Sequence, residues 1–276
     1  GLKHQVVPHL KQTVALLVKG MNEGNIKQTC DLTNQIMDQT PELSPSIIGP
    51  VFCYMIEQFH RVLAGFKFID DDEKTVAFSV HKKDREDMIK TYYGFLRYVF
   101  RTHHLHSALT TPQNQAHYQK ALQSIFQGSL NRDMGLAKAC IQILENLVTW
   151  GVRIEGLKKF LAQDVTAATI KALGTNMDQN DAKGNLAVLS ICQIHIKLAA
   201  AYGHDYISLL HQYMTKLMIS GGSGSALEQY LNTVRAAASS PEAARQAGAF
   251  EAKRALKAVL NEHQHRRKAT AATRQR

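Results

Sequence analysis

The residues best suited to bind a metal form one short histidine cluster. His103, His104 and His106 lie within four residues of one another, and imidazole nitrogens are common zinc ligands. No carboxylate or cysteine lies close by in the sequence to complete a coordination shell. Histidines near a helix end can instead cap its carbonyl groups and stabilise its dipole. That role is the better interpretation, so we expect no metal and no cofactor. A helical metalloenzyme built on these histidines is the weakest alternative.

The remaining chemically versatile side chains form no catalytic pattern. The sequence contains no Gly-x-x-x-x-Gly-Lys-Ser/Thr, Gly-x-Gly-x-x-Gly, His-Glu-x-x-His or Gly-x-Ser-x-Gly motif. Cys30, Cys53, Cys140 and Cys192 are far apart and have apolar neighbours, which indicates reduced core thiols and a reducing compartment. His195 lies in an apolar helical segment, so we interpret it as a hydrogen-bonded core or groove histidine. The sequence therefore predicts a protein that is not an enzyme.

Positive charge is concentrated near the C-terminus. The chain has 33 Lys and Arg against 23 Asp and Glu, a formal net charge of +10. Residues 251–276 contribute +6 of this charge and residues 1–250 only +4. Basic clusters neutralise phosphates and release counterions, which gives sequence-independent affinity for RNA. A disordered solubilising tail or a nuclear-localisation sequence would have the same composition. The candidate RNA-binding residues here are Lys253, Arg254, Lys257, Arg266, Arg267, Lys268, Arg274 and Arg276.

A second candidate RNA contact lies in an aromatic segment between residues 92 and 100. Aromatic rings beside arginines can stack on bases. The spacing of Phe95 and Val99 favours core packing for most of the segment. Tyr93 and Arg97 lie four residues apart on one helical face and are the least core-like pair. We therefore add these two residues to the candidate site.

Helical periodicity extends over nearly the whole chain and predicts an all-α fold of about eleven helices. Hydroxyl–proline pairs at Ser44, Thr111 and Ser240 are predicted helix N-caps, and Gly65, Gly151 and Gly203 are predicted left-handed glycines at helix C-termini. Alternation at residues 75–80 is the one strand-like pattern, within an acidic insertion at 66–80. The expected helices span residues 9–22, 26–39, 46–64, 84–101, 112–130, 133–150, 154–173, 182–202, 205–219, 226–238 and 241–265.

The helices pair at intervals of roughly 35–50 residues, close to the repeat of HEAT and armadillo solenoids. The sequence thus predicts antiparallel HEAT-type hairpins stacked in a solenoid, with a compact helical bundle as the alternative. We expect HEAT-like repeats over residues 1–220, a terminal helical pair over 221–265 after a Gly/Ser turn, and a basic tail over 266–276. We expect no membrane insertion, because Gln193, His195 and Lys197 interrupt the most apolar stretch. The opening Gly1 without Met indicates a fragment or a processed chain.

Several segments resemble the C-terminal half of exportin-t, the tRNA exportin family of the importin-β superfamily. Residues 136–151, LAKACIQILENLVTWG, are similar to a late HEAT helix of that family. The resemblance extends upstream through 84–99 and 118–128 in the same order. Downstream, residues 181–189, DAKGNLAVL, and 206–218 are similar to its last long hairpin, with 227–260 as the terminal pair. No short diagnostic motif carries this resemblance, which covers most of the chain as a helix-by-helix pattern.

The resemblance implies a receptor without enzymatic activity that binds mature tRNA together with Ran-GTP. Such a receptor carries tRNA past nuclear pore proteins and shuttles between nucleus and cytoplasm. The resemblance also implies that Ran-GTP binds chiefly to N-terminal repeats of the receptor. The C-terminal repeats help to enclose the tRNA through basic residues. No family motif assigns individual tRNA contacts here. A HEAT protein–protein scaffold, or an exportin for another cargo, is the alternative.

Overall fold

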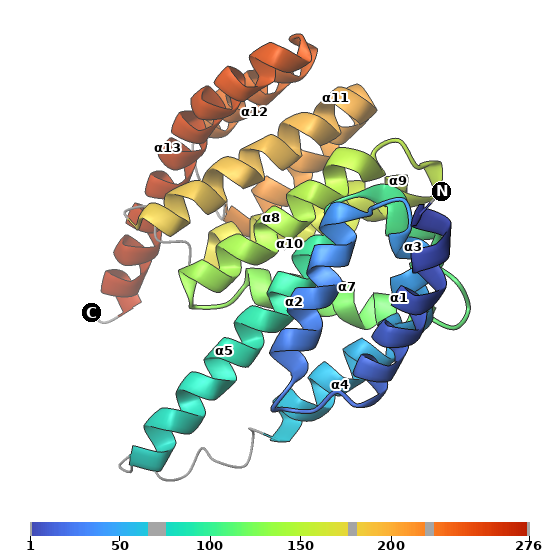
Figure 1. The fold of residues 1–276 in the computed structure, drawn as a ribbon. Coiled ribbons are helices and arrows are strands. Elements are labelled where there is room, and N and C mark those ends of the chain that lie inside the picture. Colours follow the sequence, from blue (N-terminus) through green and yellow to red (C-terminus); the bar gives the residue numbers. More distant parts are fainter. Residues whose placement is uncertain (1, 66–75, 176–180, 219–223, 275–276) are drawn as a thin grey trace. The chain divides into compact units, whose positions relative to one another are not determined.

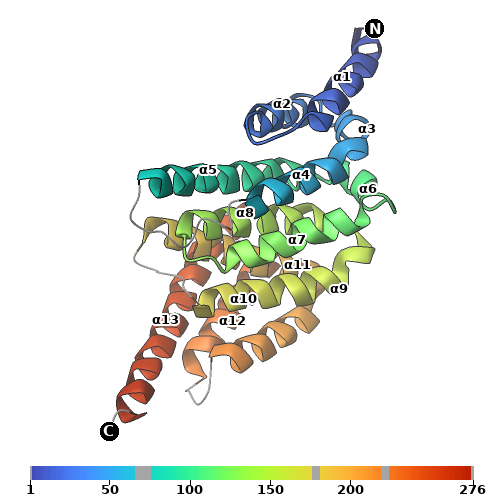
Figure 2. The same ribbon diagram turned by 90° about the horizontal axis from the view of Figure 1, so that it is seen from below.

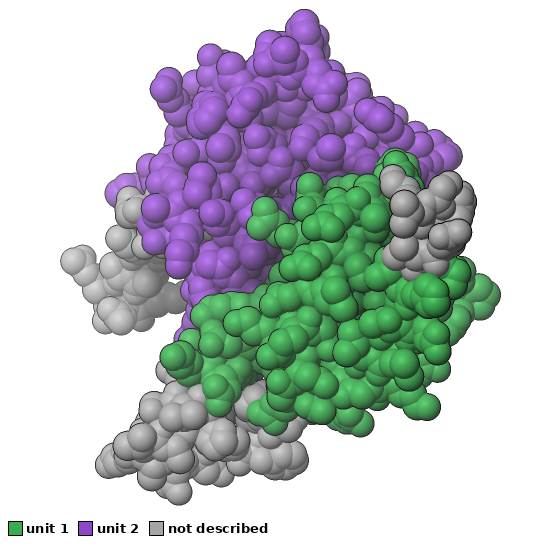
Figure 3. Space-filling view, in the orientation of Figure 1, with its two compact units in different colours: residues 1–125 green, residues 126–276 purple. Residues whose placement is uncertain are grey.

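The computed structural model describes residues 2–65, 76–175, 181–218 and 224–274 (Figures 1 and 2). The described residues are helical and contain no strand, so the all-α prediction is confirmed. Ten described helices have ten or more residues, and a kink divides one of them, which agrees with the expected number. Contacts group the chain into two compact units, residues 1–125 and 126–276 (Figure 3).

Unit 1 is built from short helical pairs. Its elements are α1 (Leu2–Lys19), α2 (Ile26–Gln39), α3 (Ser44–Ile48), η1 (Gly49–Val51), α4 (Phe52–Gly65), α5 (Val76–Val99), η3 (His103–Leu105), α6 (His106–Leu109) and the first part of α7 (Gln115–Ser129). Its aromatic core joins α4 to α5, since the Phe59 ring lies 5.0 Å from Tyr92 and 5.9 Å from Phe95. The core assignment of most of the aromatic segment is thereby confirmed.

Unit 2 contains the longer helices. Its elements after α7 are α8 (Met134–Gly151), η4 (Glu155–Leu157), α9 (Lys158–Phe160), the π-helical turn η5 (Leu161–Val165), α10 (Thr166–Thr175), α11 (Ala182–Met218), α12 (Ser225–Ser239) and α13 (Glu242–Arg274). Helix α11 contacts α8, α10, α12 and α13, and its apolar side chains, such as Ile191, Ile194 and Leu198, are fully buried. Unit 2 is therefore organised around α11.

Helix α11 changes direction at Gly203, whose backbone has φ +66° and ψ −141°. This left-handed region is costly for residues with a Cβ atom, and among the described residues only Gly203 occupies it. The predicted break between residues 202 and 205 is therefore confirmed, whereas the left-handed conformation predicted at Gly151 is wrong, because Gly151 ends α8 without a positive φ. The kink leaves Tyr206, in the second segment, close to His195 in the first, with ring centroids 6.5 Å apart.

The three predicted hydroxyl N-caps are wrong. Ser44 lies inside α3, and its hydroxyl donates to the Thr40 carbonyl at 3.0 Å. The Ser240 hydroxyl likewise donates to the Ala236 carbonyl at 3.0 Å, and that of Thr111 to the Ala108 carbonyl at 3.1 Å. Each hydroxyl thus caps the end of the preceding helical turn, because Ser and Thr can donate to carbonyls three or four residues earlier.

Several sequence predictions concern positions that the structure describes only in part. Residues 76–80 form the first turns of α5, so the strand-like alternation there does not produce a strand. The acidic residues at 70–73 and most of the Gly/Ser run at 221–225 lie outside the described residues. The backbone of α13 is helical through Arg274, including most of the expected tail. Whether the units are HEAT repeats stays a prediction, as do the repeat boundaries proposed from sequence.

Helices α12 and α13 form an antiparallel pair that approaches closely at Gly248. A Cβ atom at this position would lie 2.6 Å from the Cβ atom of Ala237 and 3.3 Å from its Cα atom. Neither atom can move without displacing the α12 backbone. The small residues Gly248 and Ala237 therefore let the two helices approach closely. The alanines of α13 that are buried here are Ala249, Ala252 and Ala255.

Replacing Gly248 with alanine should destabilise the protein by about 1 kcal/mol or more, because overpacking outweighs the better helix propensity of alanine. Gly94, within α5, is a control with the opposite expected sign, since nothing lies within 4 Å of its added Cβ. Gly94→Ala should stabilise by up to about 1 kcal/mol. Urea denaturation of both variants measures the two effects. Stabilisation by Gly248→Ala would contradict the close approach.

Candidate functional site

A chain of buried polar side chains links three helices of unit 2. The Thr169 hydroxyl donates to the Thr166 carbonyl at 2.9 Å, so it accepts from His195 Nε2, 3.0 Å away. His195 Nδ1 then accepts from the Tyr230 hydroxyl at 2.7 Å. Tyr230 also hydrogen-bonds to Cys192. Residues from α10, α11 and α12 therefore fix one another through a satisfied network, which we call the His195 network (Thr166, Thr169, Cys192, His195, Tyr206 and Tyr230).

The His195 network has catalytic residue types but lacks the access and protonation that catalysis needs. Burial lowers the pKa of His195 to about 3 and raises the pKa of Cys192 to about 12. Burial also raises the pKa values of Tyr206 and Tyr230. His195 and Cys192 are fully buried, so no substrate reaches them. A thiol in this environment is a poor nucleophile. The network is structural, and the prediction of a hydrogen-bonded core histidine is confirmed.

All four cysteines are buried and free, as the sequence predicted. Burial raises the pKa of Cys30 to about 12 and that of Cys140 further still. The thiolates of Cys30, Cys140 and Cys192 form only well above physiological pH, so these three side chains behave as small apolar groups. The reducing compartment inferred from them stays a prediction.

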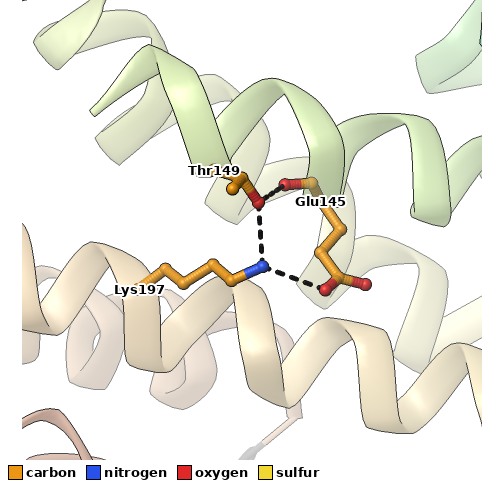
Figure 4. Close-up of polar contacts among 3 residues, drawn as sticks. All are labelled: Glu145, Thr149 and Lys197. Carbon is orange, nitrogen blue, oxygen red and sulfur yellow. Dashed lines mark hydrogen bonds and ion pairs between the residues drawn. The ribbon is translucent and has the colours of Figure 1, made fainter. Parts of the chain in front are cut away.

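A partly buried ion pair connects α8 to α11 (Figure 4). Lys197 Nζ lies 3.0 Å from Glu145 Oε1 and donates to the Thr149 hydroxyl at 2.8 Å. That hydroxyl donates to the Glu145 carbonyl at 2.8 Å. With its amide nitrogen facing the carboxylate, Gln193 donates to both Glu145 oxygens at 2.9 and 3.2 Å. The Lys197 charge is thereby engaged inside the protein and is a poor candidate for contacting phosphate.

Replacing Lys197 with methionine should destabilise unit 2 by about 1–2 kcal/mol, because Glu145 loses its counter-charge while it stays mostly buried. The side chains of Lys197 and Glu145 are only 31% and 19% exposed. Urea denaturation of Lys197→Met, Glu145→Gln and the double variant gives the coupling energy. The exposed Lys90–Asp87 pair serves as a control that should couple weakly. Equal coupling in the two pairs would contradict this account.

The candidate RNA-binding residues of the C-terminal region lie on α13. Arg254 is exposed, and Lys253 and Lys257 are half-buried, with no ion-pair partner among the described residues. Arg266, Arg267, Lys268 and Arg274 belong to the helical backbone, but their side chains, and all of Arg276, lie outside the described part. Among the residues of α13 whose side chains are described, up to residue 265, the last buried one is Leu260. Beyond it the helix extends past α12 (Figures 1 and 2).

The sequence predicts an apolar stripe of Phe250, Leu256, Val259 and Leu260 along this helix, and the structure departs from it at one residue. Leu256, Val259 and Leu260 are buried as expected, whereas Phe250 is 48% exposed. Phe250 points about 120° away from Leu256 around the helix, because six residues, about one and two-thirds turns, separate the two. The buried positions in this part of α13 include the alanines Ala249, Ala252 and Ala255 instead.

Tyr93 and Arg97 lie on α5 of unit 1, apart from the α13 candidates in the chain. The Tyr93 hydroxyl donates to the Ser124 carbonyl at 2.9 Å, and its ring contacts Tyr92 with centroids 5.2 Å apart. Tyr93 is half-buried and thus packs within the unit, while Arg97 is exposed. The structure gives Tyr93 a packing role, and a base contact for this pair stays a prediction.

The histidine cluster does not form a coordination shell among the described residues. His103 and His104 stack with ring centroids 4.5 Å apart, and His106 Nδ1 lies 3.5 Å from the Tyr118 hydroxyl. Burial lowers the pKa of His106. Within the described ranges, no group of three His, Cys, Asp or Glu side chains could hold a metal ion. The cluster instead forms the short helical turn between α5 and α7.

Among the described helices, α11 is long and apolar enough to cross a membrane by length and composition. Its most apolar window has a mean hydropathy of 1.4, and 56% of that window is buried inside the protein. The expectation that no stretch is sufficiently apolar is therefore wrong. Burial against four helices also accounts for this composition, and the absence of membrane insertion stays a prediction.

The chain matches no protein-family model, no curated protein and no solved structure. Functional inference therefore rests on the residues themselves, on their placement in the two units and on the resemblance of the helical segments.

Proposed function

We propose that this chain is the C-terminal part of a nuclear export receptor for tRNA, with a HEAT-type solenoid fold. The observation that carries the proposal is the basic α13, which has eight basic and three acidic residues and whose helical backbone continues to Arg274. The segments that resemble the tRNA exportins support it. Residues 136–151 fall in α8, 181–189 and 206–218 in the two segments of α11, and 227–260 in the α12–α13 pair.

The proposed mechanism is recognition of shape and phosphate. A-form RNA hides its base edges in a deep major groove, so proteins read it largely through its backbone. Lys and Arg side chains of α13 would contact phosphates without chemical change to the RNA. In this proposal tRNA binds cooperatively with Ran-GTP, which binds chiefly to the N-terminal repeats of such receptors. The receptor contacts nuclear pore proteins and shuttles between nucleus and cytoplasm.

A HEAT-repeat scaffold for protein partners, or an exportin for another cargo, is the second candidate. Residues 1–250 carry a net charge of only +4, which gives most of the chain little general attraction for RNA. Leu16 of α1 and Tyr54 of α4 are 64% and 53% exposed, and exposed apolar side chains suit protein contacts.

Competition binding separates these candidates. Labelled tRNA is bound to the chain and displaced either by unlabelled tRNA or by an unstructured RNA of the same length and charge. Shape recognition predicts that tRNA competes at least about tenfold better, at a free-energy difference of about 1.4 kcal/mol. Equal competition would contradict specific tRNA recognition by this chain and would favour the scaffold.

A further inference from the structure

The exposed side of α13 presents one aromatic ring among cations. Phe250 is 48% exposed and is the only large apolar side chain that the described part of α13 exposes. Ala249, Ala252 and Leu256 are buried on the opposite side, against the rest of unit 2. About half of the ring surface is therefore accessible to a ligand.

Positive side chains lie on the same face as Phe250. Arg254 and Lys257 follow it by four and seven residues, a spacing that places side chains above one another on a helix. Lys253 lies on the flank, three residues from Phe250, and the exposed Gln246 lies four residues before it. Glu251 is the nearest acidic residue in sequence and points about 100° away around the helix. Over its length α13 has eight basic and three acidic residues.

We propose that this face binds an unpaired RNA nucleotide, with its base stacked on Phe250 and its neighbouring phosphates on Arg254 and Lys257. The inference rests on the proposed function and extends it from phosphate contacts to a base contact. A stacked base needs one accessible ring and flanking cations, which is the arrangement found here. A protein-docking patch would need contiguous apolar surface, and its centre would be depleted in Lys.

Two double-stranded RNAs of identical paired sequence test the inference, one blunt at both ends and one ending in three unpaired nucleotides that include 2-aminopurine. Phe250→Ala should weaken binding of the overhang RNA about tenfold and leave the blunt RNA unaffected. Phe250→Trp should keep the affinity. Binding of the wild-type chain should quench 2-aminopurine fluorescence through stacking, and Phe250→Ala should lose this quenching. Leu186→Ala, at another exposed apolar residue of unit 2, is the matched control and should change neither affinity.

The Arg254→Gln variant separates the base contact at Phe250 from phosphate recognition by α13. Arg254→Gln should weaken both RNAs and reduce the salt dependence of binding. If Arg254→Gln does so while Phe250→Ala changes neither affinity nor quenching, the stacking contact is overturned and phosphate recognition stands. If the wild-type chain binds neither RNA, both fail. A Phe250→Ala variant with altered oligomeric state and unaltered RNA affinity would show that the ring binds protein instead.

Discussion

Replacing His195 with alanine is expected to lower the free energy of unfolding by about 3–5 kcal/mol. The substitution leaves a cavity between α10, α11 and α12 and removes the acceptor of the fully buried Tyr230 hydroxyl. It also removes the donor to Thr169. Urea denaturation followed by the fluorescence of Trp150, the only tryptophan of the chain, reports on unit 2.

His204→Ala is the matched control, because His204 lies on the same helix and is exposed. Its effect should stay within about 0.5 kcal/mol. Tyr230→Phe removes only the hydroxyl that donates to His195 and should cost about 1–2 kcal/mol, which keeps the test informative if His195→Ala does not fold. A loss below 1 kcal/mol for His195→Ala would show that the network does not hold the unit together.

The same histidine predicts destabilisation by mild acid. Burial lowers the pKa of His195 to about 3, whereas an unfolded histidine titrates near 6.5. Between these values the unfolded chain binds a proton that the folded chain does not. Stability should therefore fall as the pH drops below about 6.5, by up to about 1.4 kcal/mol per pH unit. Comparing the wild type with His195→Gln from pH 7 to pH 4 isolates this contribution. Parallel pH profiles would contradict it.

Reversing three charges near the end of α13 should have the largest effect on RNA binding. The Arg266→Glu/Arg267→Glu/Lys268→Glu variant is expected to lose about 100-fold in tRNA affinity at low salt, because phosphate contacts become repulsive. Log affinity decreases with log salt concentration, and the magnitude of this slope should become smaller by about 2–3, close to one for each lost phosphate contact. Fluorescence anisotropy at several salt concentrations measures both quantities.

A matched reversal elsewhere separates local contact from net charge. Arg132, Arg153 and Lys159 are exposed residues of unit 2 outside α13. Their replacement by glutamate changes the net charge as much as the triple variant of α13 does. It should alter the slope of log tRNA affinity against log salt concentration by less than about one. If the two triple variants weaken binding equally, the affinity depends on overall charge, and the assignment to α13 is wrong.

Local pattern was sufficient to predict which segments are helical and where one of them breaks. The stripe of Ile26, Cys30 and Ile36 predicts residues 26–39, which are the bounds of α2. Gly203 marks the α11 kink because few other residues adopt its backbone conformation. Burial of the cysteines follows from their apolar neighbours. These features depend on residues within one or two helical turns, so a single sequence contains the information.

Contacts between distant residues could not be predicted in this way. His195 is 26 residues from Thr169 and 35 from Tyr230 in the chain, and Lys197 is 52 residues from Glu145. Nothing in the local pattern pairs them. Phe250 was misassigned because large apolar residues were expected inside, whereas this ring projects from the side of α13 away from the buried Ala252 and Leu256. The exposed ring on α13 follows from helix packing rather than from hydrophobicity.

Photo-crosslinking of tRNA to the chain, followed by mass spectrometry of the crosslinked peptides, tests whether α13 is the RNA-binding element. The account predicts that nucleotides are attached to peptides from residues 242–276, and that an excess of unlabelled tRNA suppresses the crosslinks more strongly than unstructured RNA of equal length. Crosslinks confined to residues 1–241, or no crosslinking of tRNA at all, would contradict the assignment of α13 as the RNA-binding element.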